Sequence, residues 1–119
     1  MADSKTVYGS VVAVQPTTWT ARDQQTAALA TASRAAPTDG SRHYVTLVMA
    51  NYDSSSQSGM AELKFGATIV FRSRVGPNSP VRVVLPSPLE VPQNTAVSLE
   101  LAAGGAGVVG NAAIGGFTR

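Results

Sequence analysis

Apolar and polar residues alternate with a period of two along most of the chain, which predicts strands and not helices. The clearest alternation spans residues 42–53, where both faces of the expected strand carry apolar or aromatic residues. One face holds His43, Val45, Leu47, Met49 and Asn51, and the other holds Tyr44, Thr46, Val48, Ala50 and Tyr52. Because a strand that is apolar on both faces is typical of one that is covered on both sides, we expect this strand to be central.

Further short strands are predicted downstream, each followed by turn-forming residues. They cover residues 61–65, 69–72, 81–85, 96–102 and 108–117. Gly66 is expected to form a tight turn or bulge, and the polar segment 53–59 and the glycine-rich segment 103–107 are expected to be exposed loops. Prolines at 86, 88 and 92 favour an extended connection along a sheet edge. This pattern predicts an all-β fold, an antiparallel β-sandwich of jelly-roll-like architecture.

The first third of the chain has a weaker pattern. Residues 6–14 alternate as a strand does, whereas residues 20–36 are compatible with an alanine-rich helix or with a pair of strands. We favour a strand near residues 25–31, preceded by an extended N-terminal arm. The chain is therefore divided into an N-terminal arm or first strand, residues 1–20, and a β-sandwich domain, residues 21–119. The arm is expected to reach a neighbouring subunit.

Charge is sparse in this chain of 119 residues. Charged residues make up 13%, the formal net charge is +2, and Ala, Ser, Thr and Gly supply 52 residues. Such a small, neutral surface suits a subunit that neighbours cover. Cysteine is absent, which excludes disulfides and thiolate chemistry. Neither a signal peptide nor an apolar run of about 20 residues is recognised, so we expect a protein made in the cytoplasm with no membrane partner.

Candidate catalytic and cofactor-binding residues are few. His43 is the single histidine; we interpret it as a packed or solvated side chain, because no nucleophile elbow accompanies it. The carboxylates are dispersed and form no calcium-loop motif. The glycine-rich stretch 104–110 precedes a predicted strand instead of the helix that a phosphate-binding loop requires. We expect no enzyme activity, no catalytic residues, no metal site and no cofactor.

Arginines and aromatic residues are the candidates for interfaces. Arg72 and Arg74 share a predicted strand face, and Arg82 is expected in a strand paired with theirs, so that the three would form one basic stripe. Three arginines without exposed aromatics are too few for nucleic acid, and pairing with carboxylates across a subunit interface is favoured. Trp19 and Tyr8, in the expected arm, are candidate interface anchors.

Several segments together resemble small β-sandwich structural proteins of tailed bacteriophages. These are RHYVT at 42–46, AELKFGATIVF at 61–71, VRVVLPSPL at 81–89, and NTAVSLEL at 94–101 with the glycine-rich loop and final strand that follow. The resemblance covers residues 25–119 and rests on strands and turns, with no catalytic signature.

The resemblance implies a virion component on the capsid surface. It suggests a capsid decoration, or cement, protein that binds the major capsid protein on the outside of the phage head as a homotrimer and stabilises the head. The alternative is a tail or tail-fibre associated protein that binds carbohydrate or the host surface. Removing residues 1–20 is expected to abolish capsid binding and to leave the sandwich folded.

Overall fold

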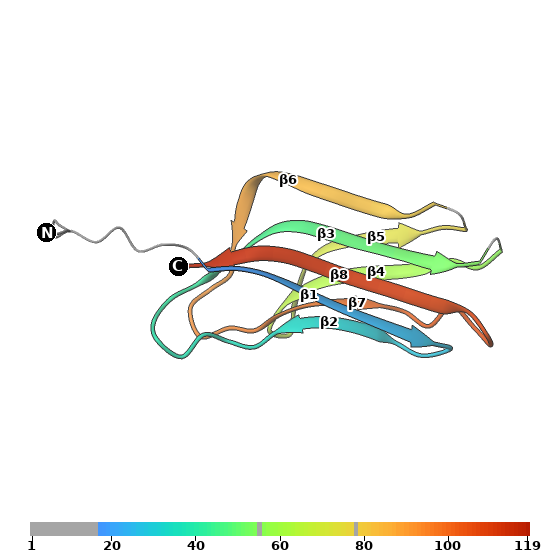
Figure 1. The fold of residues 1–119 in the computed structure, drawn as a ribbon, viewed down its shortest axis with the longest axis horizontal. Helices are drawn as coiled ribbons and strands as arrows, with labels where there is room; N and C mark the ends of the chain where they lie inside the picture. Colours follow the sequence, from blue (N-terminus) through green and yellow to red (C-terminus); the bar gives the residue numbers. More distant parts are fainter. Residues whose placement is uncertain (1–16, 55, 78) are drawn as a thin grey trace, which may run out of the picture.

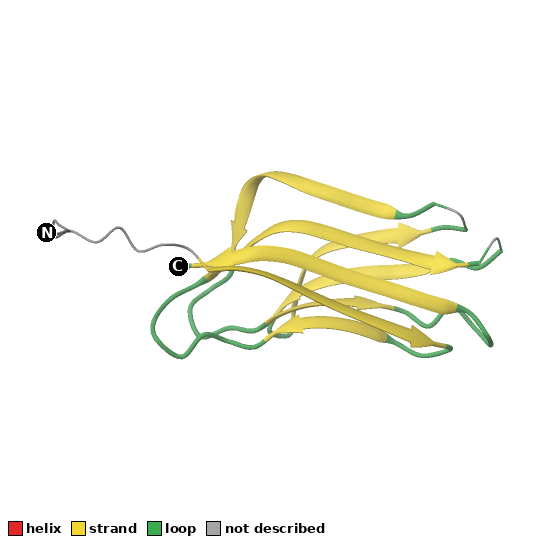
Figure 2. Cartoon of the chain, in the orientation of Figure 1, coloured by secondary structure: helices red, strands yellow, loops and turns green. Residues whose placement is uncertain are grey.

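The protein forms two antiparallel four-stranded sheets that pack face to face (Figures 1 and 2). The computed structural model describes residues 17–54, 56–77 and 79–119, and no helix occurs among them. The strands are β1 (Thr17–Thr26), β2 (Ala30–Arg34), β3 (His43–Asp53), β4 (Gly59–Phe65), β5 (Thr68–Val75), β6 (Val81–Glu90), β7 (Val97–Leu101) and β8 (Val109–Thr118). The predicted all-β sandwich is confirmed.

The order of the strands defines the type of sandwich. One sheet has the order β1-β8-β3-β6 and the other β2-β7-β4-β5. Every connection except the β4–β5 hairpin therefore crosses from one sheet to the other, and the first strand pairs with the last. This is the strand order of an eight-stranded jelly roll.

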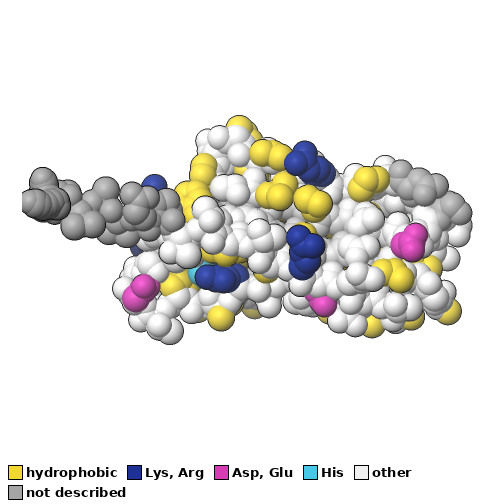
Figure 3. All heavy atoms as spheres, viewed as in Figure 1, with side chains coloured by type: hydrophobic (Ala, Val, Ile, Leu, Met, Phe, Trp, Pro, Cys, Tyr) yellow, Lys and Arg dark blue, Asp and Glu magenta, His cyan; other side chains and the backbone are white. Residues whose placement is uncertain are grey.

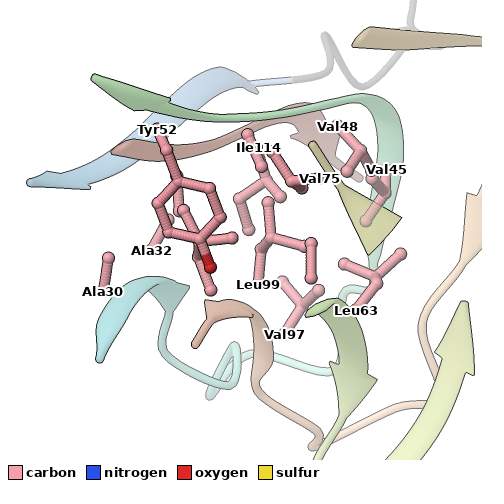
Figure 4. Packing of buried hydrophobic residues seen from close by; sticks show 14 of the residues in the cluster. Ala30, Ala32, Val45, Val48, Tyr52, Leu63, Val75, Val97, Leu99 and Ile114 are labelled. Atoms are coloured by element: carbon pink, nitrogen blue, oxygen red, sulfur yellow. The ribbon is translucent and has the colours of Figure 1, made fainter. Parts of the chain in front are cut away.

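The hydrophobic core lies between the two sheets, and both supply it (Figure 4). Alternate residues of the strands point inward, as the period of two requires. The largest fully buried side chains are Leu63, Leu99, Leu101, Ile114, Val45, Val48, Val75, Val91 and Val97. Tyr52 lies at one end of this core, where its hydroxyl donates a hydrogen bond to the carbonyl of Ala102.

A bulge in β3 changes the faces that strict alternation predicts. The register of β3 shifts between Val45 and Leu47 against both of its neighbours, β6 and β8. His43 and Val45 point inward before the bulge, and Val48, Ala50 and Tyr52 after it. The extra residue thus exchanges the two predicted faces in the second half of the strand. β3 is central as expected, since it lies between β8 and β6, but the described chain leaves its outer face partly open, since Met49 there is 37% exposed.

The proline-containing segment lies in an edge strand, as predicted. Val84 of β6 pairs with Leu47, and Leu89 pairs with Val45, so the four residues 85–88 between them stand opposite one residue of β3. Pro86 and Pro88 fall in this stretch, where no ladder hydrogen bond is lost. Figure 1 shows the bend that results in β6.

The N-terminal third differs from its prediction. β1 ends at Thr26, and Ala27 has a positive φ of 58° in the turn to β2, so the strand expected over residues 25–31 is wrong. Residues 17–20 belong to β1, paired with β8. The predicted strand over residues 6–14, Tyr8, and the rest of the expected arm through residue 16 lie outside the described residues.

Candidate functional site

The three predicted arginines do not form one stripe. β5 and β6 belong to different sheets, so Arg82 projects from the sheet opposite to the one that carries Arg72 and Arg74. Arg72 forms an ion pair of 2.8 Å with Glu62, and Arg74 donates a hydrogen bond of 3.4 Å to Ser58. The prediction failed because the turn at 76–80 connects two sheets instead of two paired strands.

Trp19 lies in the core of the sandwich and not on an arm. It pairs with Gly116 in β8 and is 7% exposed. The guanidinium of Arg34 stands 5.5 Å from its ring centroid. The indole is therefore covered by its own chain, and the surface of the described residues does not offer it as an anchor for a neighbour.

His43 is the centre of a buried hydrogen-bond network at this end of the sandwich. Its Nε2 lies 2.7 Å from the carbonyl oxygen of Ala35, and its Nδ1 lies 2.6 Å from Oγ1 of Thr118. The indole Nε1 of Trp19 donates to the same Oγ1 at 3.0 Å. Because a carbonyl only accepts, the hydrogen bonds assign the proton to Nε2 and let the Thr118 hydroxyl donate to Nδ1.

A hollow of about 590 Å³ adjoins this network and raises the question of chemistry. A hydroxyl beside an imidazole has the spacing of a nucleophile and its base. Here, however, a backbone carbonyl occupies the position of the orienting acid, and His43 is 3% exposed with both nitrogens bonded. Asp39, which also lines the hollow, bonds Ser41; that side-chain hydrogen bond is the main reason that the pKa of Asp39 is lowered. The hydrogen bonds around His43 therefore pair the polar groups that the fold buries at this end of the sandwich.

The part of the chain that the structure describes contains neither a metal-binding cluster nor a membrane-spanning helix. No group of three or more His, Asp and Glu side chains there is placed to hold a metal ion. No helix among those residues is long and apolar enough to cross a membrane.

The outer surface of the β2-β7-β4-β5 sheet, which we call the charged face, carries matched charges. Glu62 and Glu100 stand directly opposite each other on β4 and β7. Arg72 neutralises the first, and Lys64 forms an ion pair of 2.8 Å with the second. The hydrogen bond with Glu100 is the main reason that the pKa of Lys64 is raised. The edge strand β5 of the same sheet also exposes Ile69 and Val70, so the ion pairs mark the middle of this face and not its edge.

The outer surface of the β1-β8-β3-β6 sheet, which we call the apolar face, is different. Its middle consists of Leu47 and Met49 on β3, Val84 on β6, and Ala113 on β8, and Val84 is 61% exposed. Small residues on β8 leave a hollow of about 830 Å³ over the sheet. Figure 3 shows this face, with basic side chains on either side of a hydrophobic strip.

Two arginines lie at the margins of the apolar face. The register runs from Arg22 through Ala113 and Met49 to Arg82, so these four residues form one row across the sheet. Among the described contacts, the other basic residues have partners. Three are in ion pairs, Arg74 bonds Ser58, and Arg34 and Arg119 stand over aromatic rings. Arg22 and Arg82 have neither a carboxylate nor an aromatic ring among these contacts, so they place two positive charges on the outer surface of this sheet.

Sequence reasoning identified Arg82 but missed Arg22. The signal was present, since Thr20, Arg22 and Gln24 alternate on one face, but the expected start of the strand at residue 25 left them outside any sheet. Comparison with known proteins gives no further guide to the site: no protein family and no curated protein sequence matches this chain.

Proposed function

We propose that this chain is a structural protein of a phage virion, a capsid decoration protein that binds the outside of the head as a trimer and stabilises it. One observation carries the proposal: the middle of one outer face of the jelly roll is apolar and open, whereas the middle of the other carries two ion pairs, with Ile69 and Val70 exposed only on its edge strand β5. An exposed apolar face rimmed by polar groups is typical of a surface that another protein covers.

The residues of the apolar face suit contact between proteins. The small side chain of Ala113 lets a neighbouring backbone approach β8 closely, and Met49 supplies a flexible apolar side chain that adapts to a partner. Burial of about 25 cal/mol per Å² of apolar surface would stabilise such a contact. A trimer holds three of these contacts at once, so that weak individual contacts add to firm seating.

A structural role is also supported by the end of the sandwich that carries the histidine. Both nitrogens of His43 are used in hydrogen bonds to the protein, as are the hydroxyl of Thr118 and the indole of Trp19. We therefore propose no catalytic step and no cofactor. If His43→Ala stayed folded and lost a reproducible activity of the wild-type chain, the proposal would be overturned in favour of an enzyme.

Sedimentation tests the proposed assembly directly. The purified chain is expected to sediment at three times its mass of 12.2 kDa and to co-sediment with phage heads that lack it. Heads that have bound it should survive higher temperature than bare heads. A stable monomer without affinity for heads would refute the proposal, and binding to isolated tails instead of heads would favour the tail-associated alternative.

The role of the N-terminal segment needs a truncation that respects β1. Removing residues 1–20 would delete Trp19 and four β1–β8 pairs, so the expectation that the sandwich survives this cut is not supported by the structure. A cut after residue 16 leaves β1 complete. We expect that variant to unfold like the full chain and to lose binding to heads. Undiminished head occupancy by the folded variant would contradict a role of the segment in attachment.

A further inference from the structure

We propose that the apolar face binds an extended segment of another protein, in which two carboxylates bond Arg22 and Arg82 and an apolar side chain between them packs on Met49 and Ala113. This deepens the proposed function, and it rests on that function where it assigns the segment to the major capsid protein. The inference specifies the chemistry of the partner: acidic at two points and apolar between them.

The spacing of the two arginines sets the length of the segment. Arg22 on β1 and Arg82 on β6 are separated by three strand spacings, because β8 and β3 lie between them. With about 4.8 Å per spacing, their backbones are about 14 Å apart. An extended chain advances about 3.3 Å per residue, so residues i and i+4 span about 13 Å and point to the same side. Two carboxylates four residues apart therefore match the two guanidinium groups.

The surface between the arginines fits the residue at i+2. Ala113 and Met49 occupy the middle of the row, and the small side chain of Ala113 leaves room above β8. The next row toward the loops consists of Gln24, Asn111 and Asn51. Their amide groups lie about two residues further along the strands, where they can bond the backbone of a bound segment.

The described residues of a second copy of this chain do not supply the carboxylates. Two apolar faces packed on each other would bring like-charged arginines together. Of the six acidic residues in the described part, Glu62, Glu90 and Glu100 are in ion pairs, and Asp23 and Asp39 accept hydrogen bonds within the chain. Asp53 alone remains, and one carboxylate does not match two arginines.

Nucleic acid also fits this face poorly. Base stacking needs open aromatic faces, but Tyr44 and Phe117, the aromatic residues at the end of this sheet, stack on each other at 5.0 Å. The guanidinium of Arg119 stands over both rings, 5.0 Å and 5.6 Å from their centroids. Two arginines about 14 Å apart would neutralise only about two phosphates, which gives weak binding.

Synthetic peptides with blocked ends test the inference on the full-length chain. The probe has the sequence glutamate–threonine–valine–threonine–glutamate, which places both carboxylates and the valine on one side. Amide NMR titration at low salt is expected to shift the signals of Ala113, Met49, Arg22 and Arg82. A peptide with glutamine in place of both glutamates, and one with serine in place of the valine, should each bind more weakly.

Matched variants locate the binding. Arg22→Gln combined with Arg82→Gln should weaken binding of the acidic peptide roughly tenfold, the effect of two exposed ion pairs. Arg72→Gln combined with Arg74→Gln makes the same charge change on the charged face and should leave binding unaltered. Equal loss in both double variants, equal binding of the glutamine peptide, or shifts confined to the charged face would overturn the inference. The inference would also be overturned if a second copy of the chain displaced the peptide from the apolar face. The same holds if a twelve-nucleotide oligo(dT) bound as tightly as the acidic peptide.

The outcomes separate this inference from the proposed function. If the chain binds heads and Arg22→Glu with Arg82→Glu binds them equally well, the decoration role stands and the inference is wrong. If the acidic peptide binds as described and heads are not bound, the peptide-binding face stands and its assignment to the capsid is wrong.

Discussion

Thr118 holds the buried network at the histidine end of the sandwich together, and its removal is the sharpest test of that network. The Thr118 hydroxyl accepts from the indole of Trp19 and bonds Nδ1 of His43. Thr118→Val keeps the shape and the strand preference of the side chain but removes its oxygen. The indole N–H and the imidazole nitrogen would then be buried without a partner.

The expected loss follows from those two groups. A buried polar group without a hydrogen bond costs about 1–3 kcal/mol. Trp19 is 7% exposed and His43 is 3% exposed, so water does not replace the missing hydroxyl without a rearrangement of the core. We therefore expect Thr118→Val to lower the free energy of unfolding by about 2–6 kcal/mol. At about 4 °C per kcal/mol, this corresponds to a fall in Tm of about 8–24 °C.

Urea denaturation followed by tryptophan fluorescence measures this loss. Thr118→Ser retains the hydroxyl and should retain most of the stability. Thr20→Val is the matched control, because Thr20 is exposed on the neighbouring strand, and its change should stay within about 0.5 kcal/mol. The reasoning would be refuted if Thr118→Val and Thr20→Val unfolded at the same urea concentration. Long-range ¹⁵N NMR should also find the His43 proton on Nε2 in the wild type.

Further predictions concern backbone packing and acid stability. Gly116→Ala should destabilise the fold by more than about 3 kcal/mol in the same assay, because its Cβ would lie 2.1 Å from the carbonyl oxygen of Tyr44. Gly107→Ala, with open space but a φ of +73°, should lose only about 1–2 kcal/mol, and equal losses would contradict this account. The backbone N–H of Thr31 is the main reason that the pKa of Asp23 lies below its ordinary 3.8. The resulting stabilisation is present above the unfolded-state pKa and is lost as pH falls through the folded-state pKa. Acid titration below about pH 4 should therefore weaken the wild type more than Asp23→Asn, and parallel losses would refute this role.

Much of the fold was predictable because local patterns determine strands and turns. Strand β3 was predicted to within one residue, and Gly66, with a φ of 62°, forms the expected turn between β4 and β5. Pro86 and Pro88 indicated that their segment lies at the edge of a sheet, where β6 is found. These features depend on neighbouring residues in the sequence, and that is the information that a single sequence carries.

The errors arose where distant parts of the chain decide the structure. The bulge near Thr46 follows from the pairing of β3 with both β6 and β8, which no pattern within β3 shows. The strand that follows the turn at 76–80 joins the opposite sheet, so Arg82 was grouped with the wrong arginines. Trp19 was assigned to an arm because its burial depends on β8, about a hundred residues further along the chain.

The difference between the two sheet faces has a consequence for assembly. A sandwich with two open apolar faces could stack without limit, since each bound subunit would offer a new surface to the next. Here the ion pairs of Lys64 with Glu100 and of Arg72 with Glu62 occupy the second face, and breaking them to dock another subunit would require desolvation of four charges. Binding through the apolar face would therefore end in a single layer. Under the proposed function, a single layer is what a protein that decorates a shell requires, with its apolar face toward the shell and its charged face toward solvent.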